Sequence, residues 1–244
     1  MLIAQITDIH AAPTNGNLTR LHRVMSWIAA LRPDLLIVTG DVIDDGWHEG
    51  YPAIVAELTR AKCRFLVLPG NSDDQHALYD CLHGTVPWTT NANHALHFAE
   101  LINGFHLIGL DTTLAGETGG DITPHLPWLG QTLNRFALPA LIFMHHHIVP
   151  SGIAPIDRVM CQGAREFGQF IAGLDLPPLA VCSGHVHRAM SSVIAGVPAY
   201  ICGSVCPANP LLLDNQRIAP VTDSAALMIH DLRTGTLVSS HVSL

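Results

Sequence analysis

Aspartate, asparagine and histidine side chains follow five apolar runs of the sequence, each where a run ends. They are Asp8 and His10, Asp41, Asn71, His145, and the pair His185 and His187. Carboxylate, imidazole and amide donors without thiolate suit manganese, iron, zinc or cobalt better than a soft metal. Seven donors are too many for one tetrahedral zinc but suit two ions that share a bridging carboxylate. Two ions about 3.5–4 Å apart can generate hydroxide at neutral pH and stabilise the attacking and leaving oxygens of phosphoryl transfer.

Each of these motifs also has an ordinary structural explanation. Asp8-Ile9-His10 alone would more often be a turn or capping pair, and Asn71 beside Gly70 suits a left-handed turn. Histidine triplets such as the one that begins at His145 arise by chance. Gly184-His185-Val186-His187 is more specific, because glycine gives access to the backbone and both histidines follow a strand. The metal-centre hypothesis therefore depends on the seven residues acting together.

Strands and helices alternate in the first third of the chain. Short apolar runs predict buried strands at residues 2–7, 35–38 and 64–68. Helices are expected at residues 18–31, with Asn17 as N-cap, and at 51–61 and 75–82. This order predicts parallel pairing with right-handed crossovers. The carboxyl ends of such strands are where open α/β sheets build their sites, which places Asp41 at one of them.

The rest of the chain follows a different pattern. Residues 96–100 and 106–110 flank Asn103-Gly104 and predict a hairpin, followed by a loop at 111–123. Further helices are expected at residues 126–136 and 161–174, and buried strands at 140–144 and 179–182. Antiparallel tail strands are expected at residues 190–194, 197–202, 225–229 and 237–242. Together these elements predict an α/β fold with two packed sheets and helices outside, in a single domain spanning residues 1–244.

Composition restricts the classes of partner. Hydrophobic residues make up 48% of the 244 residues, charged residues 13%, and the formal net charge is −8. This acidic balance argues against nucleic acid or an anionic membrane as the main partner, although bound cations can reverse the local sign for a phosphorylated substrate. The six cysteines form no Cys-x-x-Cys pair, which argues against a zinc knuckle. No secretory leader or long apolar stretch is visible, so a reduced, cytoplasmic protein without a membrane partner is expected.

The ordered motifs resemble the calcineurin-like metallophosphoesterase family. Its pattern is Asp-x-His, Gly-Asp, Gly-Asn-His-Asp/Glu, a histidine pair and Gly-His-x-His, and the match extends from Asp8 to His187. Asp8-Ile9-His10 and Phe143-Met144-His145-His146 look most like the bacterial class III cyclic-nucleotide and glycerophosphodiester phosphodiesterases. The resemblance implies a four-layer αββα sandwich of two mixed sheets flanked by helices.

The resemblance also implies roles for individual residues. Asp8, His10 and His187 would hold the first ion, Asp41 would bridge, and Asn71, His145 and His185 would hold the second. His146 would support a ligand or face the substrate. The implied activity is a metal-dependent phosphodiesterase in which a metal-bound hydroxide attacks small phosphodiesters, with 3′,5′-cyclic nucleotides and glycerophosphodiesters as the first candidates. The implied cofactors are two divalent or mixed-valence ions of the manganese, iron, zinc or cobalt class.

One departure from the family pattern concerns Ser72, which stands where the family has a catalytic histidine. Serine can donate a hydrogen bond but cannot act as an acid near neutral pH. His146, His147 or His76 could substitute, the substrate could have a good leaving group, or turnover could be reduced. Three alternatives therefore stay open: a phosphomonoesterase, a nucleic-acid phosphodiesterase (which the acidic charge disfavours), and a metal-binding module with little turnover. Substrate contact by Trp47 and homo-oligomerisation are also left open.

Overall fold

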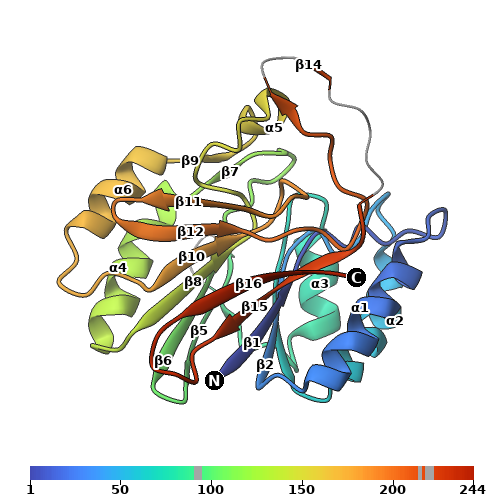
Figure 1. The fold of residues 1–244 in the computed structure, drawn as a ribbon, viewed down its shortest axis with the longest axis horizontal. Helices are drawn as coiled ribbons and strands as arrows, with labels where there is room; N and C mark the ends of the chain where they lie inside the picture. The colour runs from blue at the N-terminus through green and yellow to red at the C-terminus, as the bar shows by residue number, and fades with distance from the viewer. Residues whose placement is uncertain (91–94, 214–215, 218–222) are drawn as a thin grey trace.

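Three apolar runs near the N-terminus and two segments near the C-terminus form the first sheet (Figure 1). The computed structural model describes residues 1–90, 95–213, 216–217 and 223–244. Within these residues the sheet has five strands, in the order β16 (Val238–Ser243), β15 (Ala226–Asp231), β1 (Leu2–Ile6), β2 (Leu35–Thr39) and β3 (Arg64–Leu68). The three N-terminal strands are parallel, as predicted, and β15 pairs with β1 in the antiparallel direction.

The second sheet comes from the middle of the chain. Over the described ranges it has seven strands, in the order β11 (Met190–Ile194), β12 (Val197–Ile201), β10 (Ala180–Ser183), β8 (Ala140–Met144), β6 (Phe105–Leu110), β5 (Leu96–Ile102) and β4 (Thr89–Thr90). β5 and β6 form the predicted hairpin. Asn103 and Gly104 both have positive φ at its turn, as a tight two-residue turn requires.

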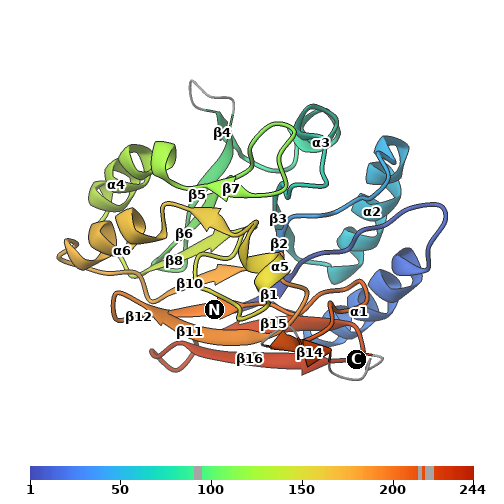
Figure 2. The same cartoon turned by 90° about the horizontal axis from the view of Figure 1, so that it is seen from above.

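Helices cover the outer face of each sheet. One group consists of α1 (Asn17–Leu31), α2 (Tyr51–Leu58) and α3 (Gln75–Leu82), and the other of α4 (Leu126–Arg135) and α6 (Ala164–Ala172). Figure 2 shows the resulting sequence of layers: helices, sheet, sheet and helices. The predicted αββα sandwich is therefore confirmed. The connections include the 3-10 turns His48–Gly50, Thr59–Ala61 and Thr123–His125 and the short α5 (Ala154–Asp157).

Two helix starts differ from the prediction. Gly16, rather than Asn17, is the N-cap of α1, because the side-chain amide Nδ2 of Asn17 instead donates to the backbone oxygen of His10 at 2.8 Å. α6 begins at Ala164 rather than at Cys161, because Gly163 has φ +83° and separates the helix from a short strand. That strand, β9 (Cys161–Gln162), pairs with β7 (Gly120–Asp121) in a segment predicted to be a loop.

The tail strands were predicted to be antiparallel, which is only partly correct. β11 and β12 are antiparallel to each other, but β12 lies parallel to β10 in the second sheet. β15 and β16 form an antiparallel pair in the first sheet. The tail therefore crosses from one sheet to the other, and a further short pair, β13 (Leu212–Leu213) and β14 (Gln216–Arg217), lies on the way.

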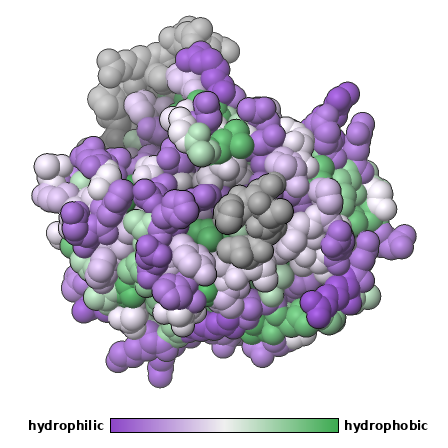
Figure 3. All heavy atoms as spheres, turned by 180° about the vertical axis from the view of Figure 1, so that it is seen from behind, coloured by the Kyte–Doolittle hydropathy of each residue, from purple (hydrophilic) through white to green (hydrophobic). Residues whose placement is uncertain are grey.

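The surface is predominantly polar. Figure 3 shows hydrophilic residues over most of one face, with hydrophobic residues in small groups between them. The large hydrophobic side chains that are exposed come from separate elements; Tyr79, Leu176 and Val238 are examples. No helix in the described part of the chain has the length and apolar character needed to span a membrane.

Candidate metal centre

Four side chains converge beyond the carboxyl ends of β1, β2 and β10. His10 Nε2 lies 3.1 Å from Asp41 Oδ2 and 3.1 Å from His187 Nε2, and His187 Nε2 lies 3.3 Å from Asp8 Oδ1. One donor atom from each of Asp8, His10, Asp41 and His187 lies within 4.8 Å of the others. We call this group the first position. The His10 and His187 side chains each keep 16% exposure, so it borders solvent.

A second group lies on the other side of Asp41. The same Asp41 Oδ2 atom is 3.4 Å from His145 Nε2. That nitrogen is also 3.2 Å from Asn71 Oδ1 and 3.2 Å from His185 Nδ1. We call this group the second position. His145 is fully buried and His185 is 8% exposed, so the second position is more enclosed than the first.

All seven predicted ligand residues therefore lie together, and a single carboxylate oxygen of Asp41 faces both groups. Asp8, His10 and His187 lie on one side of Asp41, and Asn71, His145 and His185 lie on the other. Metal binding by these residues stays a prediction.

The backbone at these residues is unusual. Asp8, His10, Asp41, His185 and His187 all have φ between +47° and +71°. Aspartate and histidine tolerate this left-handed region better than most residues, but it still costs free energy. Such conformations persist where the surrounding structure enforces them, and they cluster at functional sites. At each of the three strand ends the chain therefore turns sharply to direct the donor atoms into the centre.

Close backbone contacts hold the strand ends in place. Asp8 N donates to the backbone oxygen of Gly40 at 3.0 Å, and His10 N donates to that of Asp41 at 2.9 Å. Gly40 has φ +87°, and a Cβ there would lie 2.6 Å from Gly70 N and 2.7 Å from His145 Nδ1. Only glycine permits this approach of the Asp41 and Asn71 loops.

Ser72 contributes mainly to loop geometry. Its backbone N–H donates to Asp41 Oδ1 at 2.8 Å, which leaves Oδ2 for the two positions. Its hydroxyl donates to the backbone oxygen of Ile43 at 2.7 Å, so its proton is directed away from the donor cluster. The catalytic role predicted for Ser72 stays a prediction, and the observed contacts are those of a residue that orients the shared carboxylate.

Asp73 joins the two loops that carry Asp41 and Asn71, a role that sequence reasoning missed. Its carboxylate accepts from the backbone N–H groups of Val42, Ile43 and Gly70 and from the Tyr51 hydroxyl, at 2.9 to 3.2 Å. Burial and the nearby charge of Asp41 raise the pKa of Asp73 to about 6, despite these donors. The acidic position of the Gly-Asn-His-Asp/Glu motif was the available signal.

The histidines beside His145 are fully buried. His146 Nδ1 lies 2.9 Å from Thr112 Oγ1, and a ring nitrogen of His146 is within 4.8 Å of ring nitrogens of His145 and His185. His147 Nε2 lies 3.4 Å from Asp157 Oδ1. Among the residues that the structure describes, His146 Nε2, His147 Nδ1 and His185 Nε2 are buried without a hydrogen-bond partner. His76, the other candidate to replace an acid, is exposed on α3.

The carboxylates and imidazoles of the centre shift one another's pKa values. Burial opposes ionisation of Asp41, but His145 and His10 outweigh it and hold its pKa well below the usual range. Burial likewise opposes protonation of His10, but the hydrogen bond and charge of Asp41 raise its pKa to about 9. Burial and the charge of His145 lower the pKa of His185 to about 3. Two buried carboxylates surrounded by imidazoles are a suitable environment for cations.

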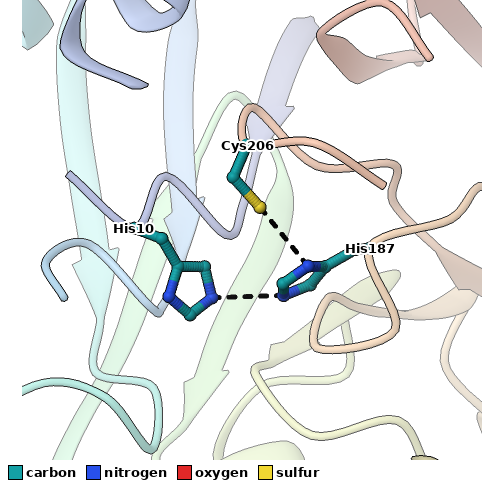
Figure 4. Close-up of side chains that lie close together, drawn as sticks. All are labelled: His10, His187 and Cys206. Atoms are coloured by element: carbon teal, nitrogen blue, oxygen red, sulfur yellow. Dashed lines mark hydrogen bonds between the residues drawn. The ribbon is translucent and has the colours of Figure 1, made fainter. Parts of the chain in front are cut away.

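Cys206 is a further neighbour of the centre, and no motif in the sequence indicated it. Its Sγ atom lies 3.3 Å from His187 Nδ1, and Figure 4 shows the thiol pointing toward the His10 and His187 rings. Burial raises the pKa of this thiol to about 12, so it is protonated at neutral pH in the metal-free protein. All six cysteines are free.

A cavity of about 230 Å³ adjoins the first position at His187. Arg188 and Asp223 also line it, and the Arg188 guanidinium pairs with the Asp223 carboxylate at 3.0 Å. The negative charge of Asp223 therefore balances the positive charge of Arg188 in this cavity. Trp47 lies on another loop, packed against Gly50, and its contact with substrate, which the sequence left open, is untested.

The family model described as calcineurin-like phosphoesterase matches residues 1–189 of the chain. The chain belongs to this family. The chain is 28% identical to a probable glycerophosphodiester phosphodiesterase from Arcobacter nitrofigilis, over 100% of this chain and 93% of the relative. It is also 28% identical to a probable cyclic nucleotide phosphodiesterase from Synechococcus, over 88% of this chain and 83% of the relative.

Other calcineurin-like phosphoesterase relatives are longer. A probable cyclic nucleotide phosphodiesterase from Psychrobacter is 29% identical over 70% of this chain, but the match spans only 51% of that protein. Among solved structures, a dimetal phosphatase from Danio rerio superimposes with a TM-score of 0.74 at 13% identity, covering 100% of this chain and 96% of its own. At that identity the likeness supports the αββα fold alone.

Proposed function

We propose that this protein is a dinuclear-metal phosphodiesterase that hydrolyses small phosphodiesters. The observation that carries the proposal is the position of Asp41 Oδ2, 3.1 Å from His10 Nε2 and 3.4 Å from His145 Nε2. A carboxylate oxygen between two groups of imidazole and oxygen donors is the arrangement that a pair of bridged cations requires.

The residues present fit two ions of the manganese, iron, zinc or cobalt class. In the proposed assignment, Asp8, His10 and His187 hold the ion at the first position, and Asn71, His145 and His185 hold the ion at the second. Asp41 bridges. His185 offers Nδ1, and its low pKa keeps it neutral, as a ligand must be. When bound, two such ions supply a nucleophile from water at neutral pH and neutralise charge on the phosphoryl group.

The chain's own residues orient this chemistry. Ser72 N–H fixes Asp41 Oδ1, so that Oδ2 faces both positions. Asp73 ties the Asp41 and Asn71 loops together through three backbone donors. The side chains of His10 and His187 are partly exposed, so in this proposal substrate reaches the centre from their side. Asn71 is the proposed residue that both holds an ion and lies near the reacting phosphate.

The substrate class follows from chemistry and from the relatives. The nearby Arg188 is already paired with Asp223, and the chain carries a net charge of −8, which disfavours a long polyanion as substrate. A small phosphodiester can instead be held by the ions themselves. The names of the relatives point to glycerophosphodiesters and cyclic nucleotides, and we propose 3′,5′-cyclic nucleotides or glycerophosphodiesters as substrates.

We expect Ser72 to lower the rate on some substrates, because serine cannot act as an acid near neutral pH. Its hydroxyl donates a hydrogen bond to the backbone oxygen of Ile43. His146 and His147 are buried, and one ring nitrogen of each lies within hydrogen-bond distance of another side chain. We therefore propose that leaving groups that need no proton react best. For leaving groups that need a proton, the loss of a general acid lowers the rate by about 10²–10⁴-fold.

The test is metal content by elemental analysis, followed on the same sample by hydrolysis of bis(p-nitrophenyl) phosphate with added Mn²⁺. Nearly two ions per chain with clear turnover would support the proposal. A screen of cyclic nucleotides, glycerophosphodiesters and p-nitrophenyl phosphate then separates diesterase from monoesterase activity. Bound ions without turnover would favour a metal-binding module, and failure to bind any ion would contradict the centre itself.

A further inference from the structure

His187 presents its two ring nitrogens to different partners. Nε2 lies 3.1 Å from His10 Nε2 and 3.3 Å from Asp8 Oδ1, inside the first position. Nδ1 lies 3.3 Å from the Sγ atom of Cys206, as the dashed line in Figure 4 shows. Cys206 is outside every motif that predicted the centre, and it approaches through an irregular segment after β12.

The chemistry of imidazole fixes the direction of this contact. A neutral histidine carries one proton, and a nitrogen that binds a metal cannot hold it. If Nε2 faces an ion, Nδ1 must be the donor and the Cys206 sulfur the acceptor. The thiol's own proton has another acceptor, because Sγ lies 3.5 Å from the backbone oxygen of Pro207. The thiol can therefore donate to Pro207 while it accepts from His187.

The segment that carries Cys206 is attached to the end of β1. Cys206 N donates to the backbone oxygen of Asp8 at 2.9 Å, and Val205 N donates to that of Thr7 at 3.0 Å. The Arg20 guanidinium donates to the backbone oxygen of Val205 at 2.6 Å. These bonds place the sulfur relative to Asp8 before any metal is present.

The same segment is also attached to the loop of His187. The Ser204 hydroxyl oxygen lies 2.8 Å from the backbone oxygen of Cys206 and 3.3 Å from that of His187. Cys206 is only 4% exposed, so the contact with the imidazole is shielded from water. The sulfur is thus fixed with respect to two residues of the first position at once.

We propose that Cys206 is a positioning residue for the first metal position: its sulfur accepts the Nδ1–H of His187 and holds the ring so that Nε2 faces Asp8 and His10. The inference rests on the proposed dinuclear centre. Metal-binding histidines almost always donate their second nitrogen to a carboxylate, a backbone carbonyl or water, and loss of that partner typically costs about 10–100-fold in metal affinity. Here a thiol lies at Nδ1, next to the Pro207 backbone that also hydrogen-bonds to His187.

The test is titration of the metal-free protein with Co²⁺, followed by visible absorption and by proton NMR of the exchangeable imidazole N–H groups that the ion shifts. Cys206→Ala is expected to weaken one of the two Co²⁺ ions by about 10–100-fold, to leave the other unchanged, and to move or remove one shifted N–H signal. Cys206→Ser, which keeps an acceptor, is expected to recover part of the affinity.

Cys202→Ala is the matched control. Cys202 is fully buried just after the same strand, and its sulfur contacts the backbone oxygens of Gln5 and Gly203 rather than a candidate ligand. Equal losses of affinity in the two variants, or normal affinity and N–H signals in Cys206→Ala, would overturn the inference. If the alanine variant does not fold, Cys206→Val fills the space without an acceptor and gives the same test. If the wild-type protein binds no Co²⁺, the dinuclear centre itself is refuted.

Discussion

The Nε2 atoms of His10 and His187 lie 3.1 Å apart, although the two residues are 177 positions apart in the sequence. Two imidazole nitrogens at this distance repel each other if both present lone pairs, so a proton or a cation must be shared there. The carboxylates of Asp8 and Asp41 complete the surroundings with negative charge. Without metal, a proton on His10 meets this requirement: burial opposes it, but the hydrogen bond and charge of Asp41 raise the pKa of His10 to about 9.

Divalent ions are therefore expected to stabilise the folded protein. An ion that binds only the native state at 100 times its Kd contributes about 2.7 kcal/mol. For a chain of 244 residues this corresponds to a rise in Tm of about 5–10 °C. Differential scanning calorimetry of metal-free protein with Mn²⁺ or Zn²⁺ checks the expectation, with a chelator to reverse the shift. An unchanged Tm with every first-row divalent ion tried would contradict it.

Asp41→Asn is expected to remove activity more strongly than any other single exchange of comparable size. The substitution removes the charge that faces both positions, and hydrolysis of bis(p-nitrophenyl) phosphate should fall by at least about 10²–10³-fold. Metal content should fall with it. Asp45→Asn is the control, because Asp45 is exposed on the same loop and asparagine tolerates its φ of +53°. Two ions and normal turnover in Asp41→Asn would show that Asp41 does not bridge.

Ser72→His restores the residue of the family pattern. We expect turnover of substrates with poor leaving groups, such as glycerophosphodiesters, to rise by about 10-fold or more, since an acid contributes about 10²–10⁴-fold when well placed. Turnover of bis(p-nitrophenyl) phosphate, whose leaving group needs no proton, should change little. The ratio of the two rates is the measurement. Lower activity on every phosphodiester tried would show that a missing acid is not the limitation.

Acid is expected to destabilise the fold through a histidine remote from the centre. His230 is fully buried, with its ring nitrogens 2.9 Å from Gln5 Oε1 and 2.8 Å from Ser239 Oγ. Burial lowers its pKa to about 4. Because this value is below the unfolded value of 6.5, the unfolded chain binds the proton first. Stability is then complete above pH 6.5 and is lost as the pH falls toward 4.

Urea unfolding between pH 7 and pH 4 measures this loss, for which we expect up to about 3 kcal/mol from this residue. Other buried histidines add to the slope in the wild-type protein. In His230→Gln the dependence of the unfolding free energy on pH should be shallower, whatever the variant's stability at pH 7. Identical slopes in both proteins would mean that His230 is not the titrating group.

The sequence allowed Asp8 and Asp41 to be placed together, because the parallel strands that precede them must finish at one edge of a sheet. His185 follows a strand of the second sheet, so its position depends on how the two sheets pack. The sequence could not reveal Cys206, which follows His187 by 19 residues and reaches the centre through backbone bonds to Thr7 and Asp8. The direction of the Ser72 hydroxyl likewise depends on a carbonyl from another loop. Gly163 was visible in the sequence as a residue that could precede the start of α6, but the predicted helix began at Cys161.

The left-handed backbone at Asp8, His10, Asp41, His185 and His187 also bears on how long the protein survives in a cell. At about 1 kcal/mol each, these five conformations reduce the free energy of unfolding by about 5 kcal/mol, against a typical total of about 5–15 kcal/mol. Bound ions would offset this deficit. A molecule that lacks them would unfold more often and be degraded sooner, because proteases act on the unfolded fraction. Metal supply would then regulate the abundance of the protein as well as its activity.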